Sequence, residues 1–475
     1  MKRDFLKSPH DAQEGRDQSM RKPHIPPLRE IDWKHLIRRL IASIGDGWYF
    51  HGDPMSQDRR RLVLCNYTSN VIANLVGGSF WTGLLLYLDA DDGFIGTVTM
   101  IATAANMLQM FAPLLLERFP RRKKLLISLR SIMYLLNVLF IGLIPLFPVA
   151  RQARLTLTAL ATLMVNLISA LSSPGITIWH IQSLPDRVRQ PYFTLVTTTN
   201  CVVIAIAILL GGKLVDLFRD AQMEYWGLMA LRLIALVLCV VEIIMYTRIR
   251  EYPYESDGER LRVGDLLTKP LRNRLYLLTV LVAVLWNFSC NLPSSYYTVY
   301  LLKNLGVSYT YLNLVNMMNV PVSLMIAPLW RKVLGKHGWF KTLYISMGLY
   351  ALRYIPLAFT TSHAMFLYPI EEVFRFLFAI GINLAFAGIP YVNMPKSGQT
   401  AYIGFYSTCA NLAALLGVTA SKYFILLTGE RTITILGCTM INKQYLMLLT
   451  TFLMLLAVLG IFLIDRRVSA QKAQS

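Results

Sequence analysis

Long apolar segments separated by short polar connections constrain this chain more than any other feature of its sequence. Many of them exceed the roughly 20 residues that a helix needs to cross the hydrocarbon core of a bilayer. Of the 475 residues, 55% are hydrophobic and only 16% are charged, which is too apolar for a water-soluble domain. The sequence therefore predicts an all-α polytopic membrane protein.

The apolar segments form two groups of six on either side of a hydrophilic stretch. We expect membrane spans at residues 62–88, 93–116, 121–147, 153–176, 191–215 and 225–247, and then at 273–301, 308–330, 340–360, 364–389, 400–427 and 444–464. This plan predicts five parts: an N-terminal segment at 1–61, a six-helix bundle at 62–247, a linker at 248–272, a second bundle at 273–465 and a tail at 466–475.

Lysine and arginine are concentrated in the connections on one side of these spans, whereas the connection with Asp89, Asp91 and Asp92 has no base. Since basic connections stay in the cytoplasm, both termini and the linker are expected there, in a multi-pass plasma-membrane protein. The net charge of +20 is spread over many connections and forms no single patch, so no nucleic-acid partner is expected.

One polar region outside the spans has a helical pattern. At residues 31–44 apolar side chains recur at helical spacing, with Lys34, Arg38 and Arg39 on the other side. Such a helix suits a membrane surface rich in anionic lipid. Packing against the protein's own cytosolic loops is the alternative.

Two landmarks repeat between the halves of the chain. Residues 112–125 read APLLLERFPRRKKL, and residues 327–341 read APLWRKVLGKHGWFK, with the same Ala-Pro entry and a basic turn. Residues 184–193 and 394–403 share a proline and an aromatic residue at identical spacing. Because six spans separate the copies, the halves should be related by an axis along the membrane normal.

The first of these connections resembles the signature of the major facilitator superfamily, G-x-x-x-D-R-x-G-R-R-x-x-L. Glu117 stands at the acid position, and prolines replace the two glycines. The direct matches are Arg118, Arg121, Arg122 and Leu125. The resemblance implies twelve helices in two pseudo-symmetric six-helix bundles that rock about a central site. It also implies a conformational latch formed by Glu117, Arg118, Arg121 and Arg122. The alternative is that this cluster only sets the topology.

Polar stripes within the spans predict a cavity, because a polar group in hydrocarbon is costly unless it has a partner or lines a wet chamber. In the resembling family several of these spans line the central path. The candidate substrate-cavity residues are Asn70, Asn74, Trp81, Asn106, Asn200, Trp286, Asn287, Asn291, Asn316 and Asn411. For each asparagine alone, an interhelical hydrogen bond is an equal alternative.

Charged residues deep in spans are few. Glu372 and Arg375 share a face of the tenth span, and Arg353 lies near the middle of the ninth. We predict that Glu372, with Arg375 and Arg353, couples proton movement to transport. A static ion pair between the two spans is the alternative. Glu242 and Arg130 are instead expected to reach the membrane interface.

Enzyme signatures are missing. The sequence has no ATP-binding G-x-x-x-x-G-K-[ST] loop and no HExxH or G-x-S-x-G motif, and its six cysteines form no CxxC pair. No catalytic residue, metal or cofactor is therefore expected.

The resulting hypothesis is a monomeric secondary transporter of a small organic solute, coupled to protons and not an enzyme. Methionines that supply an adaptable lining favour efflux of amphiphilic compounds: Met107, Met110, Met317 and Met318. The asparagines favour the alternative, uptake of a polar nutrient. A membrane sensor or assembly partner that does not transport is the alternative from another class.

Overall fold

The computed structural model describes residues 54–112, 119, 121–182, 186–251, 270–394, 399–429, 431–435 and 438–474. The predicted surface helix at 31–44, most of the linker, and the latch residues Glu117 and Arg118 lie outside these residues. From Asp58 onward the chain forms one unit, and the description below concerns that unit.

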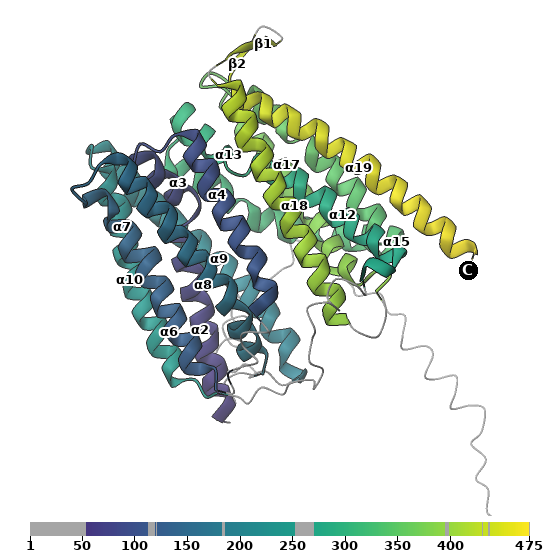
Figure 1. The fold of residues 1–475 in the computed structure, drawn as a ribbon, viewed down its shortest axis with the longest axis horizontal. Helices are drawn as coiled ribbons and strands as arrows, with labels where there is room; N and C mark the ends of the chain where they lie inside the picture. The colour runs from purple at the N-terminus through teal and green to yellow at the C-terminus, as the bar shows by residue number, and fades with distance from the viewer. Residues whose placement is uncertain are drawn as a thin grey trace, which may run out of the picture. The chain divides into compact units, whose positions relative to one another are not determined.

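Helices make up nearly all of the described chain (Figure 1). Eight of the described helices are long and apolar enough to cross a membrane, and a ninth crossing is counted if Tyr309–Ser323 and Met325–Phe359, bent by 52°, form one span. Helices that are shorter or less apolar than these lie in the expected spans at 62–88 and 93–116. The chain is thus an all-α polytopic membrane protein, consistent with twelve crossings.

The helices of the first half follow the expected order. They are α2 (Pro54–Leu75), α3 (Gly78–Tyr87), α4 (Asp92–Met107), η2 (Leu108–Phe111), α6 (Lys123–Tyr134), the π-helix η3 (Leu135–Phe140), α7 (Ile141–Leu143), η4 (Ile144–Leu146), α8 (Arg151–Gln182), α9 (Asp186–Asp220) and α10 (Glu224–Arg248). Figure 1 shows α6, α8 and α10 side by side, in agreement with their contacts.

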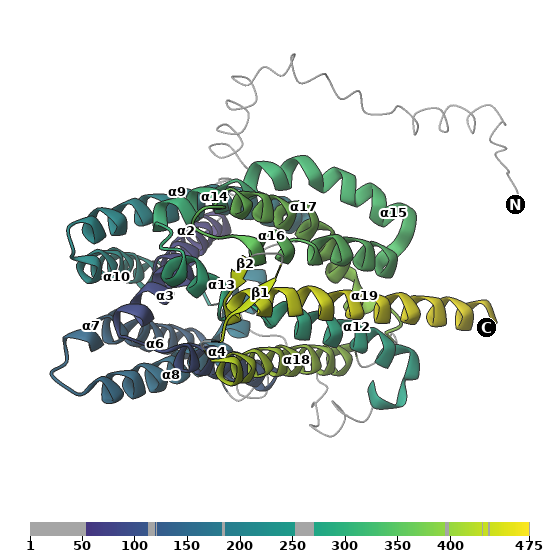
Figure 2. The ribbon, with the colours of Figure 1, turned by 90° about the horizontal axis from the view of Figure 1, so that it is seen from above.

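The described residues of the second half form a further series of helical segments. They are α12 (Arg274–Asn291), α13 (Tyr297–Val299), the π-helix η5 (Tyr300–Asn304), α14 (Tyr309–Met317), α15 (Asn319–Ala351), α16 (Tyr354–Phe359), α17 (Leu367–Gly388), η6 (Ile389–Tyr391), α18 (Gln399–Thr428) and α19 (Asn442–Gln474). A short antiparallel hairpin, β1 (Ile433–Ile435) and β2 (Cys438–Met440), connects α18 to α19. In Figure 2, α12 lies between α18 and α19, both of which it contacts.

Local sequence explains where several helices begin and break. The side chain of Asp91 accepts a hydrogen bond from the backbone N–H of Phe94 (2.6 Å) and caps α4. Ser308 caps α14 in the same way. The expected first span is broken at Gly78, whose φ of 54° favours glycine. Gly338, with φ 75°, separates the expected eighth and ninth spans within α15.

Apolar side chains face both inward and outward, as a bilayer requires. One buried cluster lies mainly in the first half and includes Ile72, Phe80 and Val138, and another lies in the second half around Tyr276, Met347 and Met454. Large apolar side chains on the outside are strongly exposed, including Val237 on α10 (64%) and Leu427 on α18 (80%). In water this surface would be costly, but against lipid it is favourable.

The two halves pack against each other through helix pairs. Helix α4 contacts α18, and α9 contacts α14. Several glycines permit this approach: a Cβ on Gly83 would lie 1.8 Å from the Tyr309 hydroxyl, and one on Gly96 would lie 2.5 Å from the Tyr296 hydroxyl. Small residues at such crossings let helix backbones come close in membranes.

Candidate functional site

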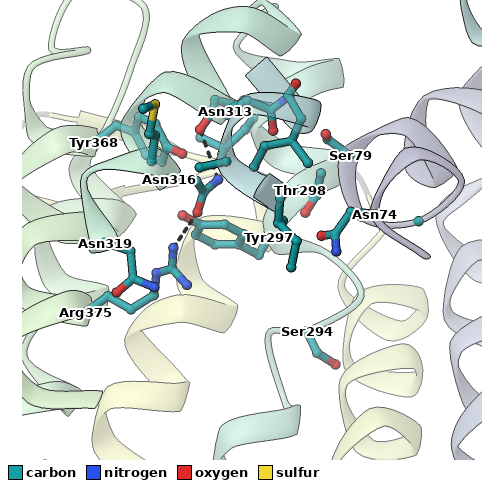
Figure 3. Close-up of a pocket in the computed structure, with 18 of the residues that line it drawn as sticks. Asn74, Ser79, Ser294, Tyr297, Thr298, Asn313, Asn316, Asn319, Tyr368 and Arg375 are labelled. Carbon is teal, nitrogen blue, oxygen red and sulfur yellow. Dashed lines mark hydrogen bonds between the residues drawn. The ribbon is translucent and has the colours of Figure 1, made fainter. Parts of the chain in front are cut away.

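A cavity of about 620 Å³ lies between the two halves. The first half contributes residues from α2, α3 and α9, and the second half contributes residues from α12 to α17. Figure 3 shows the polar part of its lining, from Asn74, Ser79, Ser294, Tyr297, Thr298, Asn313, Asn316, Asn319, Tyr368 and Arg375. A cavity of this volume accommodates a small organic molecule.

Broken helices supply much of this lining. Asn74, Gly78 and Ser79 stand at the break between α2 and α3. Ser294 and Tyr297 follow the end of α12, where Pro293 cannot donate a backbone hydrogen bond. Irregular backbone at membrane depth is tolerated where it lines a cavity, so these breaks are typical of a binding site.

Two buried ion pairs form one wall of the cavity. Nη1 of Arg353 lies 2.6 Å from Oε1 of Glu371, and Arg375 binds Glu372 through Nε (2.7 Å) and Nη2. The hydroxyl of Tyr297 donates to both carboxylates, at 3.1 Å for Glu371. Both carboxylates are almost fully buried, at 0% and 1% exposure. The network therefore places two carboxylates, two guanidinium groups and one phenol together at the pocket.

The two arginines differ in how far their side chains are exposed to the cavity. Arg353 is buried and its guanidinium carbon lies 4.7 and 4.4 Å from the ring centres of Tyr350 and Tyr354. Such aromatic faces stabilise a desolvated cation. The side chain of Arg375 is 30% exposed and also donates to Oδ1 of Asn316 at 2.5 Å (Figure 3). Arg375 is thus the cation that a solute in the pocket can reach.

The structure brings together some of the predicted site residues. Asn74, Asn316, Arg353 and Arg375 line the cavity, and Glu372 lies directly behind Arg375. Glu372 pairs with Arg375 on the face of the helix that the two were expected to share, and Arg353 pairs with Glu371. The pair between the ninth and tenth spans that we weighed as the alternative is the one between Arg353 and Glu371.

Other predicted cavity residues are absent from the lining of this described cavity. Trp81 packs against the first apolar cluster, and Trp286 packs against the rings of Tyr350 and Phe386. Three asparagine side chains donate to backbone carbonyls one turn earlier in their own helices: Asn70, Asn287 and Asn291. The remaining three also lie outside this lining: Asn106, Asn200 and Asn411.

The candidate residues chosen from the sequence leave out several residues of the site. Tyr297 and Glu371 complete the ion-pair network, and Asn313 and Asn319 add amides to the lining. The adjacent acids Glu371 and Glu372 in one apolar span were a signal, because a helix turn directs neighbouring residues to different partners. The position of Tyr297 had no such signal, since it depends on the break after α12.

A second buried cluster corrects the expectation for Glu242 and Arg130. Glu242 is 0% exposed and accepts from Nε of Arg130 (2.7 Å), from the Ser69 hydroxyl (2.8 Å) and from the Tyr134 hydroxyl (2.8 Å). Both charged side chains are enclosed by α2, α6 and α10 instead of pointing outward from the helices. The expectation was wrong because each charge has a partner that lies more than 60 residues away.

The described part of the predicted latch contacts the beginning of the linker. Arg121 is exposed, and the backbone N–H groups of Arg122 and Lys123 donate to the carboxylate of Glu251 at 2.6 and 3.0 Å. Glu251 thereby caps the start of α6. The latch role of all four residues stays a prediction.

Bonds between the halves gather at the end of the unit where α4 begins, which we call the Asp92 end. The ammonium of Lys443 lies 2.7 Å from the carboxylate of Asp92. The carboxylate of Asp216 accepts from the backbone N–H groups of Tyr309 and Thr310. At the opposite end, Nε1 of Trp179 in α8 donates to the backbone carbonyl of Arg250, two residues after the end of α10.

One family model matches most of the chain. The model of the Major Facilitator Superfamily matches residues 62–418. No curated protein matches the chain. Among solved structures, a mutant of the nucleoside transporter NupG is 12% identical, with a TM-score of 0.66, covering 86% of this chain and 99% of that chain.

Two further structures show the same fold. A bacterial homologue of the iron transporter ferroportin, in an inward-facing state, is 14% identical with a TM-score of 0.66 and covers 87% of this chain and 99% of that one. A bacterial homologue of the human lysosomal transporter Spinster, inward-facing and unoccupied, is 16% identical with a TM-score of 0.62, covering 88% and 98%. At these identities the likeness concerns the fold alone.

Proposed function

This chain belongs to the major facilitator superfamily, and from that premise we propose that it moves a small organic solute by alternating access, coupled to protons. The membership makes it a multi-pass membrane transporter, and not an enzyme. The proposed path passes through the cavity between the halves. We place the protein in the plasma membrane with both termini in the cytoplasm, as the distribution of basic residues favours.

The observation that carries proton coupling is the pair of buried carboxylates beside the cavity. Glu371 and Glu372 share the hydroxyl of Tyr297, and each has one arginine partner. If Arg375 leaves Glu372, a charge would remain almost completely desolvated, which is costly by several kcal/mol. Taking up a proton removes that cost. A change of partner by Arg375 is therefore linked to proton binding.

The lining combines apolar side chains, such as Phe80, Ile204 and Leu312, with hydrogen-bonding groups, so it suits a solute that has both kinds of surface. Met317 lines the cavity, whereas Met318 is 46% exposed and does not appear in this described lining. The amides of Asn74, Asn313 and Asn319 and the guanidinium of Arg375 offer hydrogen bonds. A solute that carries hydrogen-bonding groups is hence the candidate for this pocket, and uptake and efflux are the two directions to be tested.

Other partners follow from the same proposal. We expect a monomer that needs no cofactor and no nucleic acid, and an N-terminal helix at residues 31–44 that meets anionic lipid. In the described ranges no three His, Cys, Asp or Glu side chains gather in a group that could hold a metal ion. An organic solute therefore fits the described pocket better than a metal ion.

Flux measurements on the purified protein in liposomes test the proposal. A panel of labelled polar solutes should include at least one that accumulates when a pH gradient is imposed. Glu372→Gln should abolish this accumulation but should still allow the solute to move down its own concentration gradient. Asp220→Asn, at the exposed end of α9, is the matched control and should behave as the parent. Accumulation by Glu372→Gln at the parental level would disprove coupling through Glu372. Binding without flux would instead indicate a sensor.

A further inference from the structure

The wall of the cavity around Arg375 offers hydrogen-bond donors to a solute. Nε and Nη2 of Arg375 bind Glu372, and Nη2 also binds Asn316, while no acceptor among the described residues is bonded to Nη1. Figure 3 shows Asn319 beside Arg375. Its Oδ1 accepts from the hydroxyl of Ser323 at 2.9 Å, which leaves its amide N–H groups as donors. A group that only accepts hydrogen bonds and carries negative charge matches this surface.

We propose that the transported solute is a small organic monocarboxylate, which binds Arg375 and Asn319 through its carboxylate while Glu372 takes up one proton. This inference rests on the proposed function, because it assumes that the cavity is the transport site. It adds the chemical class of the solute and the number of protons that accompany it.

The charge balance of the pocket supports this assignment. In the observed state Arg353 and Arg375 neutralise Glu371 and Glu372. A carboxylate that binds Arg375 adds one negative charge to a buried network, and one proton on Glu372 restores neutrality. Neutral Glu372 then has an O–H group, and the charged pair of Arg353 and Glu371 is left unchanged. The anion and the proton are thus expected to move together without net charge.

Surrounding groups direct the proton to Glu372. The charged and titratable side chains that face it are Glu371, Arg375 and Tyr368 of α17, Tyr297 of α13, and Arg353 next to α16. Glu371 keeps its own partner, because Arg353 is held among three tyrosine rings. A solute carboxylate that binds Arg375 therefore competes with Glu372, and not with Glu371, for its arginine.

The far side of the cavity suggests what the rest of the solute looks like. In Figure 3, Asn74, Ser79 and Thr298 lie on the side away from Arg375. Nδ2 of Asn74 donates to the backbone carbonyl of Asn70 at 2.8 Å, so its Oδ1 is an acceptor for the solute. A ring or chain bearing a hydroxyl or N–H group would bridge the two sides.

Matched pairs of anions and neutral amides test the inference. The probes are radiolabelled nicotinate, lactate and phenylacetate, compared with nicotinamide, lactamide and phenylacetamide, and phenyl phosphate as a dianion. Transport into liposomes is measured with a pH gradient, with and without an imposed membrane potential. Proton uptake on binding is measured separately on detergent-solubilised protein in weak buffer with a pH indicator.

We expect at least one carboxylate to be transported about tenfold or more faster than its amide, with no effect of the membrane potential. Binding should take up one proton per anion in the parent and none in Glu372→Gln. Arg375→Gln should reduce the affinity for the anion about tenfold or more, and Arg375→Lys should recover part of that affinity. Arg431→Gln, on the exposed connection before β1, should bind the anion as the parent does.

The outcomes separate the two proposals. Equal transport of amide and carboxylate, a preference for phenyl phosphate, or transport that carries net charge would overturn the monocarboxylate assignment and leave the proposed function standing. If neutral solutes accumulate in the parent and not in Glu372→Gln, the monocarboxylate assignment is likewise overturned and the proposed function is kept. Failure of the parent to move any solute, including the wider panel of polar solutes, would overturn the proposed function itself.

Discussion

At the scale of single residues, the buried pair of Arg130 and Glu242 predicts a stability effect. Glu242→Gln leaves the Arg130 guanidinium, whose side chain is 14% exposed, without its counter-charge among α2, α6 and α10. Removing one partner of a buried ion pair costs about 3–5 kcal/mol. We expect a clear fall in the thermal unfolding temperature of the detergent-solubilised protein.

A double variant provides the control for this prediction. Replacing both residues with leucine removes the buried charge entirely, and such replacements are often neutral or stabilising. Arg130→Leu combined with Glu242→Leu should therefore unfold at a higher temperature than Glu242→Gln alone. If the double variant is the less stable of the two, the two charged residues stabilise the fold by more than cancelling each other's buried charge.

Tyr297 links the two carboxylates at the cavity, and its hydroxyl makes a separate prediction. Tyr297→Phe removes a donor to Glu371 and Glu372 while leaving the ring over Arg353 in place. A hydrogen bond to a charged group contributes about 1.5–3 kcal/mol, so the coupled transport rate should fall about tenfold or more. Tyr344→Phe, on the same half and away from the network, should transport at the parental rate. Unchanged coupled flux in Tyr297→Phe would remove the hydroxyl from the mechanism.

At the scale of helices, the sequence predicted more than it did at the scale of contacts. The apolar segments and the basic connections between them predicted the order of the helices, because the length and apolar character that a span needs are set by the bilayer and not by its neighbours. Glu372, Arg375, Asn74 and Asn316 were found at the site for the same reason, since a polar group within a span needs a partner or water. The remaining contacts could not be derived.

The missed features depend on tertiary structure. The stripe of asparagines along α2 bonds to its own backbone for much of its length, and only Asn74 reaches the cavity, at the break before Gly78. Likewise, nothing in the sequence near Glu242 identifies Arg130 as its partner. Periodicity along one helix gives the face of a residue, but not which helix covers that face.

The glycines between the halves give a prediction for helix packing. Gly83→Ala would place a Cβ 1.8 Å from the Tyr309 hydroxyl, and relief requires either that the buried ring, stacked on Phe80, moves or that α3 and α14 separate. Overpacking of this kind costs about 1–3 kcal/mol, which should shift the population away from the conformation closed at the Asp92 end. A spin-label distance between the halves at that end should lengthen. Gly335→Ala meets no atom within 4 Å and should leave the distance unchanged.

At the scale of the whole molecule, the ion pair between Lys443 and Asp92 joins the start of α19 to the start of α4, and so connects the two halves directly. The lysine side chain is only 4% exposed and the aspartate 22%, so water screens the pair weakly. A transporter that opens at the Asp92 end has to break this contact in each cycle. The pair should therefore stabilise the observed conformation relative to the one open at that end.

Asp92→Asn should shift this balance toward the open conformation, about tenfold in population if the pair contributes about 1.4 kcal/mol. The expected readout is faster labelling of a cysteine introduced at Ser79, in the cavity, by a reagent applied to the Asp92 side. Asp89→Asn, on the same connection and exposed, serves as the control. Exchanging the charges, with Asp92→Lys and Lys443→Asp together, should restore slow labelling, because the attraction between the halves is re-formed with its polarity reversed. Equal labelling in Asp92→Asn and the parent would mean that the other contacts at this end, including the hydrogen bonds to Asp216, hold it closed without the ion pair.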